Sequence, residues 1–102
     1  MFNGKKYVTR GAREKLHRLL EMLLWDLVEL ARHETELDHL QVFELKPAEE
    51  EVEGRRLQRI RHFQEKPRYE REVLISEEEP LSQRFYIIDS GEYSTLLLSR
   101  EY

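Results

Sequence analysis

The residues best suited to acid–base or metal chemistry are four histidines, but their spacing builds no recognisable site. They are His17, His33, His39 and His62. No two have the H-x-x-x-H or HExxH spacing that places two imidazoles on one helical face. Asp38 could orient the imidazole of His39, and His62 could exchange protons with Glu65, but neither pair has an identifiable nucleophile or oxyanion site. We expect no catalytic residue, no metal and no cofactor. An enzyme built around His39 and His62 remains an alternative.

The sequence also lacks the motifs that bind phosphate groups and the cysteines that thiol chemistry requires. The chain has four scattered glycines and no cysteine, which excludes a P-loop, a dinucleotide fingerprint, a disulfide scaffold and cysteine catalysis. Asp89-Ser90-Gly91 is typical of a hairpin turn, because it lacks the repeated oxygen spacing of a calcium loop.

A basic run is the first of two charge patterns that could bind a partner. Its members are Arg55, Arg56, Arg59 and Arg61. On a strand, Arg59 and Arg61 share a face with Phe63, and such a strip could contact phosphates or bases. Glu70 and Glu72 on the next predicted strand are placed to neutralise it. The net charge of -4 also argues against direct nucleic-acid binding, which stays a lesser alternative.

Two acidic runs form the second pattern. They are Glu49, Glu50, Glu51 and Glu53 in one connector, and Glu77, Glu78 and Glu79 in another. Most such runs are solvated loops, but they could also imitate nucleic-acid phosphates towards a basic partner.

The most regular part of the chain predicts one long amphipathic helix over residues 12–34. Apolar side chains recur at steps of three and four and form one stripe: Leu16, Leu20, Leu23, Leu27, Leu30 and Ala31, widened by Leu19 and Leu24. The opposite side is charged.

Two large apolar residues interrupt that charged side. Met22 and Trp25 project among Arg18, Glu21 and Glu29. Either a loop or a chain end folds over them, or they form a contact with a partner or a second subunit, since Trp and Met are enriched at interface cores. The candidate interface is therefore Arg18, Met22, Trp25 and Glu29.

The sequence pattern predicts six short strands. They cover residues 6–9, 38–45, 55–63, 69–75, 85–89 and 94–98, and the second has apolar residues on both faces, as an interior strand does. One helix with five to six strands predicts an α+β fold in which the helix covers one face of a mainly antiparallel sheet. The other face must be polar, covered by loops or paired with another subunit.

Length and hydropathy set the remaining limits. A chain of 102 residues fits a single domain over residues 1–102. It has no apolar run of membrane-spanning length, and its start lacks the apolar core of a signal peptide, so we expect a cytoplasmic protein that does not act in a membrane.

Several segments in the same order resemble a known family. They are MFNGKKYVTRG, MLLWDLVE, ELDHLQVFEL, HFQEKPRYEREV and IDSGEYSTLLLSREY. Together they are similar to the Gram-positive bacterial family of unknown function numbered 960, first described as a staphylococcal protein of unknown function. The family tends to have Ile-Pro at the helix entry, where this chain has Ala-Arg-Glu-Lys-Leu. The resemblance implies a small single-domain protein, often encoded near mobile-element and phage genes, and it carries over no site residue.

These observations favour a small non-enzymatic binding protein that acts through a protein–protein surface, as a homodimer or with another protein. The alternative, suggested by the resemblance, is a mobile-element or phage accessory protein that inhibits a host nucleic-acid-processing defence complex, as anti-CRISPR and anti-restriction proteins do.

Overall fold

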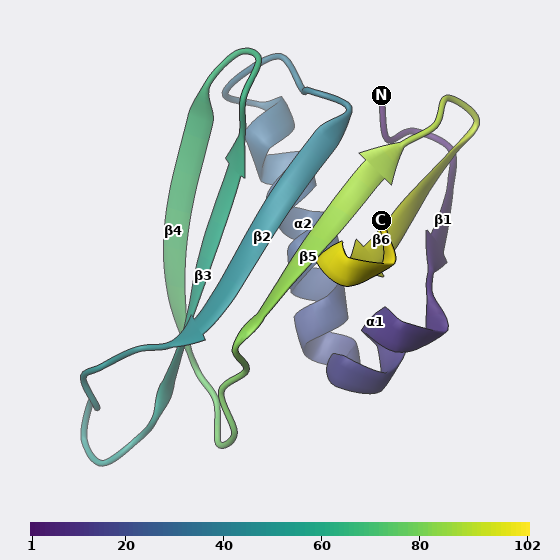
Figure 1. Cartoon of the computed structure of the whole chain (residues 1–102). Coiled ribbons are helices and arrows are strands. Elements are labelled where there is room, and N and C mark those ends of the chain that lie inside the picture. The colour runs from purple at the N-terminus through teal and green to yellow at the C-terminus, as the bar shows by residue number, and fades with distance from the viewer.

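A computed structural model describes residues 1–102 and has the α+β architecture expected from the sequence. The helices are α1 (Arg10–Lys15) and α2 (Arg18–Arg32), with a short 3₁₀ turn η1 (Ser99–Glu101) near the C-terminus. The strands are β1 (Lys5–Val8), β2 (Leu40–Pro47), β3 (Leu57–Gln64), β4 (Tyr69–Ser76), β5 (Gln83–Asp89) and β6 (Tyr93–Leu98). All six predicted strands are present, each with slightly shifted bounds. In Figure 1, α2 lies behind the sheet and the yellow C-terminal turn lies in front of it.

The six strands form one mixed sheet in the order β1-β6-β5-β2-β3-β4. Four of the five pairings are antiparallel, and only β1 runs parallel to its neighbour β6. The interior position predicted for residues 38–45 is confirmed, because β2 lies between β3 and β5. The free edges of the sheet are therefore β1 and β4.

The predicted single helix is broken in two, and capping explains the break. Thr9 caps α1 by accepting a hydrogen bond from the Ala12 N–H. Leu16 then takes an extended conformation, and His17 Nδ1 accepts a hydrogen bond from the Leu20 N–H at the start of α2. A side chain that satisfies free N–H groups at this point begins a new helix. The periodicity of the apolar residues continues across the break, so periodicity alone did not predict it.

The core lies between α2 and the sheet, but α2 presents a different face to it from the one expected. Leu20, Leu24, Leu27, Val28 and Ala31 are buried against the sheet. Relative to the apolar stripe predicted from the sequence, the buried face of α2 is rotated around the helix axis towards Trp25 and Val28. One edge of the predicted stripe is therefore exposed to solvent. Leu19, which we expected to widen the buried stripe, is 74% exposed, and Leu30 is 39% exposed.

The other face of the sheet is not covered by α2 and carries only the short 3₁₀ turn η1 near the C-terminus. Its central row runs Leu97–Tyr86–Val42–Phe63 across four strands, and Val42 is buried beneath its neighbours. The ring of Tyr102 packs edge-on against Tyr86, so the chain end covers part of this face. On the same face Glu44 forms ion pairs with Arg61 and Arg84. Two of the expected alternatives are therefore present, a partly polar face and a chain segment that covers part of it.

The two chain ends are held together. Glu101 Oε1 accepts hydrogen bonds from Thr9 Oγ1 at 2.7 Å and from the Leu98 N–H at 2.8 Å, and these lower the pKa of its carboxyl group. Gly4 lies against the backbone of Glu92, where a Cβ would meet the carbonyl oxygen at 1.9 Å. Neither helix of this fold has the length and apolarity needed to span a bilayer.

Candidate interaction surface

Trp25, the main residue of the predicted interface, belongs to the core of its own protomer. Its side chain is only 9% exposed and packs in the same apolar cluster as Phe2 and Leu24. The N-terminal segment covers this side of α2, with the Lys6 ammonium 5.7 Å from the indole centroid and Arg32 Nη2 donating to the Met1 carbonyl at 2.6 Å. The expectation that Trp25 is a docking residue was wrong, and the alternative of a chain end folding over it is correct.

The other three residues of that predicted interface do lie in solvent. Arg18 and Met22 are exposed, Met22 by 49%. Glu29 pairs with Arg32 one helical turn later at 3.2 Å, and this hydrogen bond lowers the pKa of the Glu29 carboxyl group. The four residues therefore do not form one surface, and only Met22 contributes to an apolar one.

Met22 lines a groove between α2 and the end of β4. The helix contributes Leu19, Leu23 and Asp26 to its wall, and the strand side contributes Ile75 and Glu78. The groove has a volume of about 570 Å³. His17 closes one end, where its Nε2 donates a hydrogen bond to Glu77 Oε1 at 2.6 Å while its Nδ1 caps α2. The sequence signal for this groove was the excess width of the apolar stripe.

The charged groups that line the groove are mostly acidic. Asp26, Glu77 and Glu78 contribute carboxylates, His17 is the single basic side chain among the lining residues, and no Lys or Arg is present. Glu77 is engaged by His17, whereas Asp26 and Glu78 take part in none of the ion pairs of the protein. A cationic group brought into the groove would therefore meet unpaired negative charge.

The outer side of the groove is the free edge of β4. The Glu77 N–H donates to the Arg56 carbonyl at 3.0 Å, which fixes the hydrogen-bonding pattern of the antiparallel pair. Since alternate residues of an antiparallel strand face the same neighbour, Val73 and Ile75 bond to β3. The N–H and C=O groups of Leu74 and Ser76 point away from the sheet.

The two halves of this edge strand differ in charge. In the first half Glu70, Arg71 and Glu72 are charged, and each forms an ion pair, with Arg61, Glu34 and Arg59 respectively. Charged side chains are a common protection of exposed sheet edges. The second half, residues 73–76, carries no charge, and Leu74 is 53% exposed. The unprotected half is the half beside the groove.

The predicted basic strip is neutralised as expected. Arg59 Nε lies 2.7 Å from Glu72, and Arg61 Nε lies 3.0 Å from Glu70. The Glu70 hydrogen bond raises the pKa of Arg61 further, while its guanidinium stacks 4.2 Å from the Phe63 ring centroid. The remaining two arginines are exposed in the preceding connection. Arg56 donates to the Glu78 carbonyl there, and Arg55 has no ion-pair partner.

The two acidic runs lie at one end of the sheet. The connector with Glu49, Glu50, Glu51 and Glu53 is exposed, and the run Glu77, Glu78 and Glu79 follows β4. The teal and green loops at the bottom of Figure 1 are these two connections. Gly54, Arg55, Arg56, Ser76, Glu77 and Glu78 line a shared depression between them. The first run has no ion-pair partner, whereas the second overlaps the groove.

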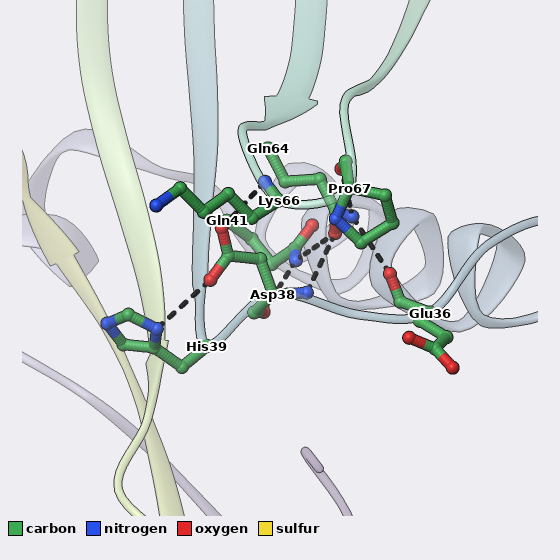
Figure 2. Close-up of polar contacts among 7 residues, drawn as sticks. All are labelled: Glu36, Asp38, His39, Gln41, Gln64, Lys66 and Pro67. Atoms are coloured by element: carbon green, nitrogen blue, oxygen red, sulfur yellow. Dashed lines mark hydrogen bonds and ion pairs between the residues drawn. The ribbon is translucent and has the colours of Figure 1, made fainter.

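A buried polar network that sequence analysis missed fixes the connection between α2 and β2 (Figure 2). Gln64 is 2% exposed and makes four hydrogen bonds. Its oxygen accepts from the Asp38 N–H at 3.0 Å and from Gln41 Nε2 at 2.7 Å, and its nitrogen donates to the Glu36 and Pro67 carbonyls at 2.8 and 2.7 Å. This amide is fully satisfied, which a buried polar group requires.

Asp38 completes the network at the surface. Its carboxylate accepts from the Lys66 N–H at 3.1 Å and contacts His39 Nδ1 at 3.0 Å (Figure 2). Burial opposes ionisation of this group, but the backbone N–H groups of Lys66 and His39 outweigh it, and the pKa of Asp38 is lowered. Asp38 thus holds the β3–β4 turn against the start of β2 and has a structural contact for each oxygen.

His62 lies beneath this network and is fully buried. Gln41 donates its amide N–H to Gln64, so its oxygen accepts from His62 Nε2 at 2.7 Å. The imidazole stacks on Phe43 with centroids 4.4 Å apart, and its Nδ1 has no hydrogen-bond partner. Burial, with a smaller effect from the Arg71 charge, lowers the pKa of His62 to about 4. His62 is therefore closed off from solvent, whereas His39 is exposed, and the two imidazoles do not face a shared cleft.

Comparisons with known proteins bear on the fold and the family of this chain. A crystal structure from Enterococcus faecalis, described as a protein of unknown function, superposes with a TM-score of 0.70 at 22% identity, over 98% of this chain and 92% of that one. At that identity the likeness concerns the fold. No curated protein matches the chain. The family model described as "Staphylococcal protein of unknown function (DUF960)" matches residues 5–101, as the sequence resemblance indicated, and the chain therefore belongs to the DUF960 family.

Proposed function

We propose that the protein is a non-enzymatic binding protein that holds a segment of a protein partner in the groove between α2 and β4. One observation carries this proposal: Leu19 and Met22 are 74% and 49% exposed beside an unpaired strand edge. Exposed apolar side chains that line a concave surface mark binding grooves more often than plain surface. The proposal replaces the Trp25 surface with the opposite side of the same helix.

A matched pair of variants tests the groove. Leu19→Asp places a carboxylate in it, whereas Arg18→Asp places a carboxylate at a neighbouring exposed residue outside it. Proteins from the native host that bind the wild type and Arg18→Asp, but not Leu19→Asp, are the expected result of an affinity capture read by mass spectrometry. Equal capture by all three proteins would exclude the groove as the binding surface.

A homodimer through the same groove is the competing form of this proposal. Sedimentation of the wild type at increasing concentration distinguishes the two forms, because a monomer keeps the mass of 12.5 kDa throughout and a dimer reaches twice that mass. In either form Leu19→Asp is expected to weaken association.

The clustering of the two acidic runs supports a second candidate function, inhibition of a nucleic-acid-processing defence complex. Here the exposed acidic end of the sheet would enter a basic groove of that complex. Such binding weakens steeply with salt. Replacing Glu49, Glu50, Glu51 and Glu53 with Gln, with the second run unchanged, tests this role without altering the groove between α2 and β4. Inhibition that survives this change would exclude the first run, and inhibition that also survives neutralisation of Glu77, Glu78 and Glu79 would rule the function out.

A further inference from the structure

We infer that the partner segment binds as a seventh strand, paired with the second half of β4, and that it is an extended peptide with apolar residues at alternate positions and flanking Lys or Arg. This inference rests on the proposed function and names the binding mode and the chemistry of the occupant. Three features of the groove lead to it.

The first feature is the supply of backbone hydrogen-bonding groups. Leu74 and Ser76 each direct an N–H and a C=O away from the sheet, in a stretch that carries no protective charge. An extended chain laid along this edge satisfies its own backbone groups at the same time. A helix laid in the groove would leave all four groups of the edge unpaired.

The second feature is the position of the apolar side chains of α2. In a strand paired with β4, alternate side chains point to the helix side of the sheet, as those of Val73 and Ile75 do. They would enter the groove and contact Leu19, Met22 and Leu23. The exposed edge of the apolar stripe would then be covered, as the opposite edge is covered by β1.

The third feature is charge. The unpaired carboxylates of Asp26 and Glu78 line the groove, and Glu79 lies just beyond it. Lys or Arg on either side of the apolar residues complements them. A second copy of this chain fits less well as the occupant. In an antiparallel β4 from another protomer, Arg71 is the one charged residue on the helix side of the strand, and it already pairs with Glu34 of its own protomer.

The experiment selects binders from a display library of random eight-residue peptides on the full chain. We expect enriched peptides to have apolar residues at i and i+2 with Lys or Arg beside them. Leu74→Pro removes one outward N–H and no hydrogen bond to β3, whereas Leu74→Thr changes the same side chain and keeps the N–H. Affinity for a selected peptide is expected to fall on the order of tenfold in the first variant and little in the second.

N-methylation of the selected peptide provides a readout that does not depend on how well the proline variant folds. Methyl groups on the amides that face β4 should abolish binding, and methyl groups on the alternate amides should not. Binding that tolerates methylation at both sets of amides would overturn strand addition.

The failures of the two proposals are distinguishable. Peptides with helical i, i+3 and i+4 spacing that bind Leu74→Pro but not Leu19→Asp would overturn strand addition and leave the groove as the binding site. No enrichment over Leu19→Asp would overturn both. A dimer that Leu74→Pro dissociates would replace the peptide with a second copy of the chain.

Discussion

The two sides of α2 carry similar apolar side chains, yet only one side is covered. On one side Trp25 is sealed by the N-terminal segment, with Phe2 in the same cluster and Lys6 above the ring. On the other side Leu19 and Met22 face the edge of β4 with nothing over them. The burial of an apolar residue on a helix therefore depends on which strand reaches it, and helical position alone does not decide it.

The largest effect of a side-chain truncation is expected from Trp25→Ala, which should lower the free energy of unfolding by about 3–5 kcal/mol, because it removes a large buried side chain. Met22→Ala on the same helix is the control and should change it by less than about 1 kcal/mol, since Met22 is 49% exposed. Chemical denaturation measures both. Similar losses in the two variants would contradict the asymmetry of α2.

Acid should weaken the protein through His62, which lies under the network that positions the β4 side. Its folded pKa of about 4 is below the ordinary value of 6.5, so the unfolded chain takes up the proton first. The contribution of the neutral His62 to the free energy of unfolding is therefore fully present above pH 6.5. It is lost as the pH falls towards 4, by about 3 kcal/mol in total.

Unfolding by urea at a series of pH values measures this loss, and His62→Gln is the comparison because it cannot titrate. The difference between wild type and variant should change most between pH 6.5 and 4. A constant difference over that range would show that the imidazole does not carry the effect.

Gly4→Ala should weaken the packing of β1 over the side of α2 that carries Trp25. The new Cβ would meet the Glu92 carbonyl oxygen at 1.9 Å, so β1 must move from β6, at a cost of about 1–3 kcal/mol. The emission of Trp25 should shift to longer wavelength as β1 loosens. Asn3→Ala, a change at the neighbouring exposed residue, should leave the emission unchanged, and an unchanged spectrum in Gly4→Ala as well would show that β1 does not seal the indole.

The smallest effect on stability is expected from Leu19→Asp, at most about 0.5 kcal/mol, because the side chain is 74% exposed. Leu20→Asp, one residue later and 1% exposed, should unfold the protein. Circular dichroism and thermal denaturation compare the two. A large loss in Leu19→Asp would mean that Leu19 supports the fold, and its use as a binding test would then be invalid.

The strands were predictable because their alternation and turn residues are local signals. The residues predicted at 69–75 and 94–98 differ from β4 and β6 by one residue at a single end. The order of strands was not predictable, since β1 pairs with β6 through residues about 88 positions apart, such as Lys5 and Tyr93. Trp25 was misplaced for this reason, because its cover depends on that distant pairing.

The groove was only partly predictable. The sequence placed Met22 on the polar side and made the apolar stripe too wide for one contact, but it could not say which edge of the stripe stays exposed. The polar network was missed altogether, because Gln41 and Gln64 read as ordinary polar positions in strands. Only the register of β2 and β3 brings them together.

The parallel pairing of β1 with β6 also sets an order of events during synthesis. β1 precedes the other five strands in the chain and has no partner until β6 has been synthesised, so the cover that β1 gives to Trp25 cannot form before then. Truncation that removes Glu101 would also affect Thr9 near the other end of the chain, because Thr9 Oγ1 would lose the carboxylate to which it donates a hydrogen bond.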